Sequence, residues 1–338
     1  MNWFWFLLFS FTSAFVLTAL LRRYALCKSL IDMPNDRSSH SIPTPRGGGV
    51  AVVVTFLVAL SVLLFEQLIP VDLFLSAIGA GAFVAVIGFM DDHGHIAARW
   101  RLLGHFAAAI WALCWIGGLA PISVFGEHVN LGWLGSILAA FFLVWMLNLF
   151  NFMDGIDGIA SIEVITACLG ACVLYALGDA DHLVWPALLL ASSTAGFLLW
   201  NFPQARIFMG DAGSGFLGII LGIVTLHAAW TSFMFFWGWL ILLGVFIVDA
   251  SLTLFRRLIR GEKVYEAHRS HAYQVASRRY RRHWPVTVVV GGINLLWLLP
   301  IAVCVTWYGL DGVIGLSLAY LPLVLLAIKY EAGQAEAG

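Results

Sequence analysis

Long apolar stretches recur along the whole chain and are separated by short polar breaks. Each stretch has roughly 17 to 25 residues, the length that carries an α-helix across the hydrocarbon core of a bilayer. The pattern predicts eleven spans, near residues 3–21, 48–69, 72–89, 102–121, 133–150, 158–177, 183–200, 214–229, 233–255, 286–307 and 313–328. The expected fold class is therefore all-α, a polytopic membrane protein.

Composition supports this prediction and limits where any chemistry can lie. Of 338 residues, 61% are hydrophobic and 11% charged, whereas a soluble domain has about a quarter charged residues. Eleven spans of roughly 20 residues leave too little chain for a folded extramembrane domain. We expect one membrane-embedded domain over 1–338, with functional groups in the loops 22–47, 90–101, 148–158, 201–214 and 256–284.

The basic residues fall on one side of the predicted topology. All 18 Lys and Arg lie in the first, third, seventh and ninth connections and in the tail after the last span. The positive-inside rule places these connections and the C-terminus in the cytoplasm, with the N-terminus outside.

Five aspartates gather at the predicted cytoplasmic ends of spans: Asp91, Asp92, Asp154, Asp157 and Asp211. Neighbouring carboxylates repel, so such a group needs a cation for stability. Oxygen-rich sites suit Mg²⁺, with Mn²⁺ as the alternative, and Mg²⁺ commonly uses one or two carboxylates together with substrate phosphates.

The segment 148–158 has the most informative spacing. Asn148 and Asn151 are three residues apart, as are Asp154 and Asp157, so these groups share one face if a helix persists through them. A helix cap would need only one such residue. The run 208–215 is a Gly-rich turn before a span, which could cradle a phosphate but is a weak signal alone.

Basic loops supply candidate anion donors. His268, Arg269 and His271 form a compact set suited to a diphosphate, whereas attraction to anionic headgroups explains 278–282. Arg46 precedes three glycines and offers a further donor, with a simple linker as the alternative. Two acids, Glu163 and Asp249, lie within apolar stretches, where they either line a polar cleft or pair with a basic helix end.

Together these motifs resemble the polyprenyl-phosphate N-acetylhexosamine-1-phosphate transferases, the family of WecA and MraY. The resemblance covers nearly the whole chain and rests on five motifs in the family's order: Pro45–Gly49, Phe89–Asp92, Asn148–Gly158, Asn201–Phe202 with Phe208–Asp211, and His268–His271. It implies transfer of an N-acetylhexosamine 1-phosphate from a UDP-sugar to undecaprenyl phosphate, with release of UMP.

The resemblance also implies roles for individual residues. Asp91 and Asp92 resemble the family's catalytic pair, and Asp211 its Mg²⁺ ligand. The residues matching the nucleotide pocket are Asn151, Asp154, Asp157, Asn201 and Phe208, with Phe208 stacking on uracil. His268, Arg269 and His271 would bind the diphosphate, and further candidates are Arg46, Asn148, Glu163 and Asp249.

Two departures from the family pattern indicate which subgroup of the family the chain resembles. The last loop lacks the histidine triplet of the peptidoglycan-precursor enzyme and looks more like the WbpL-type enzymes, which begin O-antigen chains of lipopolysaccharide. His93-Gly94-His95 replaces an acid or lysine often found in relatives. The implied location is the bacterial inner membrane with the site facing the cytoplasm, and the implied donor is of the GlcNAc or FucNAc type. No nucleic-acid partner is expected, and a homodimer stays open.

The sequence argues against two other classes of function. A carrier or flippase for an anionic sugar or lipid would require charged residues spread along a pathway through the spans, and only Glu163 and Asp249 meet that description. A non-catalytic scaffold would not need clustered aspartates. The motifs therefore favour an enzyme.

Overall fold

The computed structural model describes residues 3–34, 39, 42–94, 96–262 and 268–334. The α-helices are α1 (Trp3–Cys27), α2 (Val50–Phe65), α3 (Val71–His93), α4 (Ala98–Ile116), α5 (Gly132–Met153), α6 (Ile159–Leu177), α7 (Val184–Asn201), α8 (Asp211–Thr231), α9 (Phe233–Leu242), α10 (Gly244–Ile259), α11 (Ala272–Tyr280), α12 (Trp284–Ile293), α13 (Leu299–Thr306) and α14 (Gly312–Lys329). A 3₁₀ turn, Asp181–Leu183, precedes α7, and a π-helical stretch, Asn294–Leu298, joins α12 to α13.

Strands are few and short in the described residues. β1 (Ile31–Asp32) pairs antiparallel with β2 (Thr44–Pro45), opposite Pro45 and Thr44 respectively. β3 (Ile122–Val124) and β4 (Glu127–Val129) form a second antiparallel pair between α4 and α5. The expected all-α fold class is confirmed.

Each predicted span contains a helix or consecutive helices, but not every one is straight or long. Eight helical segments of the described chain are long and apolar enough to cross a membrane, and α9 with α10 would make a ninth span bent by 69°. α2 is a shorter apolar helix, Val50–Phe65. A polytopic membrane protein is thus confirmed, whereas the count of eleven spans and their orientation stay predictions.

The core is organised around α8, whose apolar window is 94% buried. Glycines allow its neighbours to approach closely, as is common between helices packed in membranes. A Cβ on Gly88 of α3 would lie 2.5 Å from the backbone nitrogen of Ala212. On α5, the backbone at Met146 occupies the space that a side chain at Gly218 would need. Large apolar side chains of outer helices, such as Phe65 at 86% exposure, face outward as expected against lipid.

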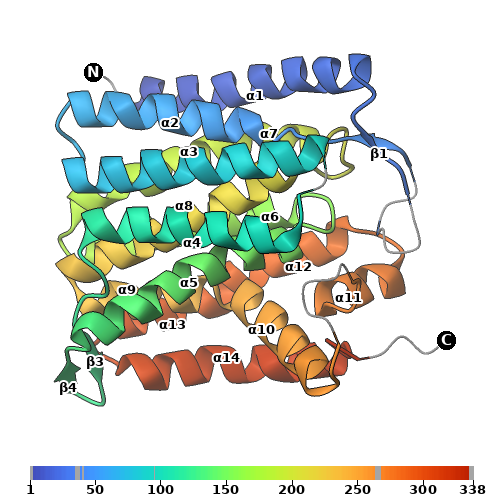
Figure 1. Ribbon diagram of the computed structural model, residues 1–338. Coiled ribbons are helices and arrows are strands. Elements are labelled where there is room, and N and C mark those ends of the chain that lie inside the picture. Colours follow the sequence, from blue (N-terminus) through green and yellow to red (C-terminus); the bar gives the residue numbers. More distant parts are fainter. Residues whose placement is uncertain (1–2, 35–38, 40–41, 95, 263–267, 335–338) are drawn as a thin grey trace.

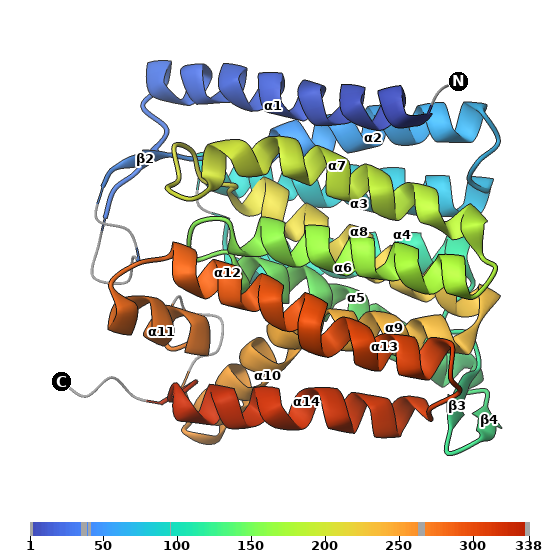
Figure 2. The same cartoon turned by 180° about the vertical axis from the view of Figure 1, so that it is seen from behind.

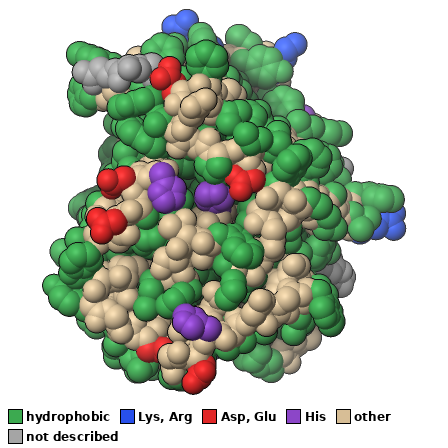
Figure 3. Space-filling model, turned by 90° about the vertical axis from the view of Figure 1, so that its left-hand side faces the viewer, with side chains coloured by type: hydrophobic (Ala, Val, Ile, Leu, Met, Phe, Trp, Pro, Cys, Tyr) green, Lys and Arg blue, Asp and Glu red, His purple; other side chains and the backbone are tan. Residues whose placement is uncertain are grey.

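The helices run roughly side by side, so their connections lie at two ends of the bundle (Figure 1). The β1–β2 pair, α11 and the C-terminus lie at one end, and the N-terminus and the β3–β4 pair lie at the other (Figures 1 and 2). Figure 3 shows this second end, where acidic and histidine side chains are spread and Lys or Arg atoms appear only at the outline. The loops predicted to carry chemistry therefore share one end.

Candidate active site

Four elements bring charged side chains together at that end. Asp91 and Asp92 lie in the last turn of α3, and Asp211 is the first residue of α8. Arg46 follows β2, and Arg101 lies in the first turn of α4. These five residues form the carboxylate–arginine cluster.

Arg46 joins two of the three aspartates. Its Nη2 donates to Oδ1 of Asp211 at 2.6 Å, and its Nε lies 2.8 Å from Oδ1 of Asp92. Burial disfavours the charge on Arg46, but the carboxylates of Asp211 and Asp92 outweigh it and raise the pKa of the guanidinium above its usual value. Arg46 thus serves as a fixed positive charge between α3 and α8.

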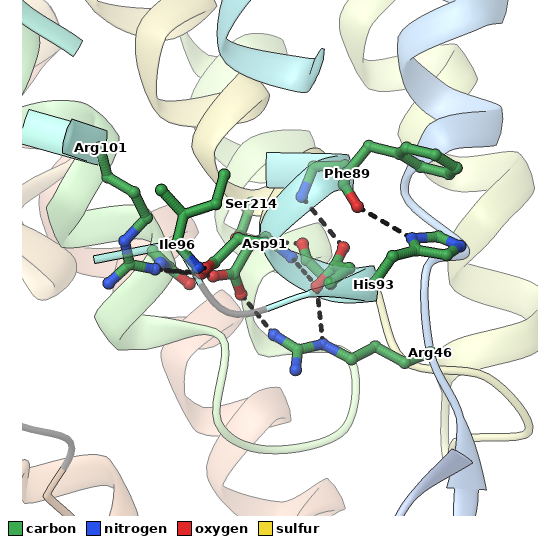
Figure 4. A network of polar contacts seen from close by, with 12 residues as sticks. Arg46, Phe89, Asp91, His93, Ile96, Arg101 and Ser214 are labelled. Carbon is green, nitrogen blue, oxygen red and sulfur yellow. Dashed lines mark hydrogen bonds and ion pairs between the residues drawn. The ribbon is translucent and has the colours of Figure 1, made fainter. Parts of the chain in front are cut away.

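Arg101 makes the second bridge from the opposite side of the cluster (Figure 4). Its Nη1 donates to Oδ2 of Asp91 and lies 3.3 Å from Oδ2 of Asp211. Oδ1 of Asp91 accepts a 2.8 Å hydrogen bond from the backbone N–H of Ile96. Both oxygens of Asp211 therefore face an arginine, and both oxygens of Asp91 are occupied.

Asp92 caps the start of α8. Its carboxylate accepts hydrogen bonds from the backbone N–H groups of Asp211 at 3.0 Å and Ala212 at 3.3 Å. An acid at this position satisfies amides that have no partner within the helix and suits the positive end of the helix dipole. Gly210 permits this approach, because its φ is +80° and a Cβ there would lie 2.6 Å from Asp92 Oδ2.

The two glycine-rich motifs form a backbone ladder. The N–H of Phe208 donates to the carbonyl of Pro45 at 2.8 Å, and the N–H groups of Gly48 and Gly49 donate to the carbonyls of Phe208 and Met209 at 2.9 and 2.8 Å. These amides are used within the protein. The pairing places Arg46 beside the start of α8, a role that the phosphate-cradle interpretation did not include.

The segment 148–158 is helical only in part. α5 ends at Met153, so Asn148 and Asn151 lie on the helix and Asp154 and Asp157 follow it. The condition for one shared face, that the helix persists, is therefore not met by the aspartates, because α5 ends before Asp154. Asn148 donates to the carbonyl of Val144 at 2.7 Å, and Oδ1 of Asn151 accepts from Ser214 Oγ at 3.3 Å.

Asp154 lies near the cluster. Burial, followed by the negative charge of Asp211, raises the pKa of the Asp154 carboxyl well above its usual value; nearby Asp157 and Asp92 add to the effect. The protein therefore holds this carboxyl in an environment that opposes its ionisation. A bound cation would relieve that opposition.

Asp157 and the next residue, Gly158, are held by groups at the start of α12 and the end of α7. His283 Nδ1 lies 3.1 Å from Asp157 Oδ2, and Thr287 Oγ1 of α12 donates to the Asp157 carbonyl at 2.8 Å. The next residue, Gly158, donates its N–H to Asn201 Oδ1 at 2.8 Å. Asn201 is 3% exposed and also donates to the carbonyl of Ile207. Its observed role is to connect two loops, and its predicted contact with a nucleotide stays a prediction.

A pocket of about 590 Å³ opens beside Asp157 and Phe208. Its polar wall comes from the end of α11 and the start of α12, and the whole lining consists of Ser39, Ile42, Thr44, Asp157, Pro203, Gln204, Ala205, Phe208, Ser277, Arg278, Arg281, Arg282, His283 and Trp284. An aromatic ring, a carboxylate and several cations in one concave space suit an anionic ligand with a flat ring.

The predicted diphosphate donors lie at the start of α11. Oδ1 and Oδ2 of Asp249 accept from the backbone N–H groups of Ala272 and Tyr273 at 2.9 and 3.0 Å, so this acid on α10 caps α11. His271 is 1% exposed, and its Nδ1 lies 3.4 Å from Asp249 Oδ1. His268 stacks on His271, with ring centroids 4.8 Å apart, and is partly exposed, as is Arg269. Only His268 and Arg269 of the predicted set reach the surface.

Glu163 lies apart from these contacts, in the interior of α6. It is fully buried, and its Oε2 accepts a 2.7 Å hydrogen bond from Asn294 Nδ2. The alternative of a basic helix end as its partner is wrong, since the observed partner is an amide. Asp249 likewise pairs chiefly with backbone amides.

Sequence reasoning missed three residues that organise the site. Arg101 was counted only for membrane topology, although it lies ten residues after Asp91 in the same loop. Tyr273 donates to the carbonyl of Phe152 at 2.9 Å and so links α11 to 148–158. His283 was not considered. A histidine beside two arginines and a span boundary was the one available signal.

The donor set agrees in kind with Mg²⁺, because the cluster offers carboxylate oxygens and Asn151 lies beside it. In the part of the chain that is described, no three His, Cys, Asp or Glu side chains converge as metal ligands. Mg²⁺ does not require such a cage when substrate phosphates complete its coordination. Asp211 could be a ligand once an arginine turns from it toward a phosphate.

Comparisons with known proteins agree with this assembly of membrane helices and clustered carboxylates. The family model described as glycosyl transferase family 4 matches residues 74–229. Relatives include a probable undecaprenyl-phosphate N-acetylglucosaminyl 1-phosphate transferase of Bacillus subtilis, 28% identical over 78% of this chain and 74% of the relative. The undecaprenyl-phosphate α-N-acetylglucosaminyl 1-phosphate transferase of Thermotoga maritima is 27% identical over 85% and 86% of the two chains.

A third relative is closer in sequence over a shorter region. The decaprenyl-phosphate N-acetylglucosaminephosphotransferase of Mycobacterium leprae is 32% identical over 71% of this chain and 68% of its own length. The chain is thus a membrane-embedded protein of the phosphosugar transferase class. It belongs to glycosyl transferase family 4, and the resemblance seen in its motifs is confirmed.

Proposed function

We propose that this protein transfers an N-acetylhexosamine 1-phosphate from a UDP-sugar to undecaprenyl phosphate and releases UMP. The observation that carries the proposal is the carboxylate–arginine cluster at the same bundle end as the pocket lined by Asp157 and Phe208. Phosphoryl transfer depends mainly on positioning the reactants and neutralising developing charge. The cluster supplies both, and the relatives' names give the substrate class.

In this proposal the arginines change partners when substrate binds. Arg46 and Arg101 both contact Asp211, so a phosphate entering the cluster offers each of them a second anion. Asp211 would then be free to hold Mg²⁺, which when bound would supply neutralisation of the charge that develops on the departing UMP.

Asp91 and Asp92 have different surroundings, which supports different roles. Asp92 accepts two backbone hydrogen bonds and pairs with Arg46, so we assign it the positioning of α8. Asp91 accepts one backbone hydrogen bond and pairs with Arg101. Because Asp91 makes one backbone hydrogen bond where Asp92 makes two, we assign to Asp91 the removal of a proton from the lipid phosphate, which then attacks the donor's β-phosphorus directly.

The nucleotide is placed in the pocket of about 590 Å³. Phe208 would stack on uracil, and Asp157 and Asn151 would contact the uridine side. His268 and Arg269 are partly exposed at the start of α11 and would bind the diphosphate. His271, being buried against Asp249, would support that loop from below.

We place the protein in the bacterial inner membrane with this site in the cytoplasm and assign it to the start of O-antigen synthesis, with a GlcNAc- or FucNAc-type donor. The one-sided distribution of Lys and Arg supports the orientation. The 268–271 motif, which lacks the histidine triplet of the peptidoglycan-precursor enzyme, supports the assignment to O-antigen synthesis. A carrier function is less well supported, because Glu163 and Asp249 are paired within the protein and do not mark a pathway.

The test is UMP release by purified protein given undecaprenyl phosphate, Mg²⁺ and either UDP-GlcNAc or UDP-FucNAc. We expect release that requires lipid and metal, with the faster donor identifying the branch. Asp211→Asn should remain folded and lose release. Retention of full activity by this variant would contradict the metal assignment, and no release by folded wild-type protein with either donor would contradict the proposed function.

A further inference from the structure

His283 lies between two hydrogen-bond acceptors at the N-terminal end of α12. Its Nδ1 is 3.1 Å from Oδ2 of Asp157, and its Nε2 is 3.0 Å from the backbone oxygen of Ser39. A neutral imidazole has one N–H, so the ring can donate to both acceptors only when both nitrogens are protonated. The backbone N–H of Asp157 also points at Nδ1 from 3.4 Å, a hydrogen bond that only an unprotonated Nδ1 accepts and that is longer than the contact with the carboxylate.

A second residue of this region, in α12 itself, also contacts Asp157. Thr287, one turn after His283, donates its hydroxyl to the Asp157 carbonyl at 2.8 Å. The carboxylate and the backbone of Asp157 are thus both fixed to α12. The side chain of His283 is 17% exposed and forms part of the pocket lining, so its position helps to set the shape of the pocket.

Charged groups of both signs surround His283. Among the described residues of the pocket, Arg278, Arg281 and Arg282 add positive charge and Asp157 is the one acid. Burial lowers the pKa of His283, but the hydrogen bond and charge of Asp157, together with the Ser39 carbonyl, outweigh it and raise the pKa above its usual value. The folded protein therefore favours the imidazolium more than water does.

We propose that His283 is a positioning residue of the nucleotide pocket, holding the Asp157 carboxylate through Nδ1 and the first connection, at Ser39, through Nε2. This inference rests on the proposed function, because it assigns the pocket to the uridine part of a UDP-sugar. Among the described residues, the hydrogen bonds and ion pair of the His283 ring are with Asp157 and Ser39 and not with the carboxylate–arginine cluster. It should affect binding of the donor far more than the chemical step.

Two amide variants separate the two contacts. In His283→Asn the side-chain amide nitrogen falls near the place of Nδ1 and can still donate to Asp157. In His283→Gln it falls near the place of Nε2 and can still donate to Ser39. His283→Ala removes both contacts. Arg279→Gln is the matched control, since it removes a positive charge from the exposed side of α11 outside the pocket lining.

The experiment measures KM for the UDP-sugar, kcat, and the affinity for UMP by titration calorimetry in detergent-purified full-length protein. Loss of one hydrogen bond to a charged group corresponds to about a tenfold change in binding. We expect KM and the Kd for UMP to rise about tenfold in His283→Ala and His283→Gln, with kcat nearly unchanged. His283→Asn, which keeps a neutral donor to Asp157 and loses the contact with Ser39, should fall between wild type and His283→Ala, and Arg279→Gln should stay close to wild type.

A pH series adds a readout that a purely structural role would not produce. As pH rises through the pKa of His283, the wild-type imidazolium is lost and KM for the donor should rise. In His283→Asn the amide does not titrate, so this rise should be absent. If the Ala and Gln variants do not fold, the comparison of wild type with His283→Asn still decides the matter.

Several results would overturn the inference. One is equal KM in wild type and all three His283 variants at every pH, and another is an equal fall of kcat in all three with KM unchanged. The proposed function fails separately, by absence of UMP release from folded wild-type protein. An active wild type with unaffected His283 variants would leave that function intact and reject only the role of His283.

Discussion

Gly88→Ala tests whether close contact between α3 and α8 sets the geometry of the carboxylates. The added Cβ would lie 2.5 Å from the backbone nitrogen of Ala212 and 2.5 Å from the carbonyl carbon of Asp211. Optimal contacts between carbon atoms are about 3.5–4.0 Å, so the two helices must separate by roughly 1 Å. Asp91 and Asp92 follow on the same helix and would move away from Asp211.

The expected effect on stability is smaller than the effect on activity. Overpacking costs about 1–3 kcal/mol, while alanine stabilises a helix interior by about 1 kcal/mol relative to glycine. The net loss is therefore about 0–2 kcal/mol, and most of the protein should stay folded. A displacement of about 1 Å at reacting groups can reduce the rate about 100-fold.

The assay compares the rate of UMP release and the thermal midpoint of Gly88→Ala with those of Gly292→Ala. Gly292 of α12 has nothing within 4 Å of its would-be Cβ, so this control makes the same chemical change without a clash. We expect about a 100-fold loss for Gly88→Ala and little change for the control. Activity of Gly88→Ala within threefold of wild type would refute the reasoning.

Three further predictions concern single contacts. Arg101→Gln removes a partly exposed counterion from Asp91 and Asp211. Loss of a charged hydrogen bond should lower kcat about tenfold or more, whereas the control Arg99→Gln, at an exposed position, should change kcat little. Equal kcat values in the two variants would contradict this. Asp249→Ala removes the cap of α11 and should cost about 0.5–2 kcal/mol in denaturant unfolding, with weaker donor binding, and an unchanged midpoint would argue against the cap. Because the pKa of Asp154 is raised, ionisation of this carboxyl destabilises the fold as pH rises through that pKa. Asp154→Asn should therefore raise the thermal midpoint above that of wild type by more at pH 8 than at pH 5, while lowering activity. A midpoint below that of wild type at pH 8 would exclude this.

Hydropathy predicted the helices well but made two of them too short beside the site, for a physical reason. The third predicted span stopped at residue 89, whereas α3 continues to His93 because Asp91 and Asp92 find arginines and helix amides as partners. The eighth was expected from residue 214 and begins at Asp211, where Asp92 caps it. Hydrophobicity does not report such partners, because they come from distant parts of the chain.

The bend between α9 and α10 was also invisible in the sequence pattern. Residues 233–255 form one apolar run, yet the helix breaks by 69° between Leu242 and Gly244. Hydropathy indicates burial in lipid or protein and does not record backbone direction. The short β1–β2 pair was missed because two-residue strands have no periodicity to detect.

Charge clustering identified most of the candidate site, but not how its parts pair. Asp91, Asp92 and Asp211 were selected as an acidic group needing a cation, and the structure supplies two arginines in contact with them. Arg46 and Asp211 are 165 residues apart. Their pairing depends on the backbone ladder and on the packing of α3 against α8, which no local motif encodes.

The most direct test of the central claim is the identity of the nucleotide released and the mass of the lipid product. Purified protein is incubated with undecaprenyl phosphate, Mg²⁺ and the preferred UDP-sugar, and the products are separated and weighed by mass spectrometry. The account predicts UMP together with a lipid that has gained a sugar phosphate and now carries a diphosphate. Release of UDP with a lipid that has gained only the sugar would contradict it.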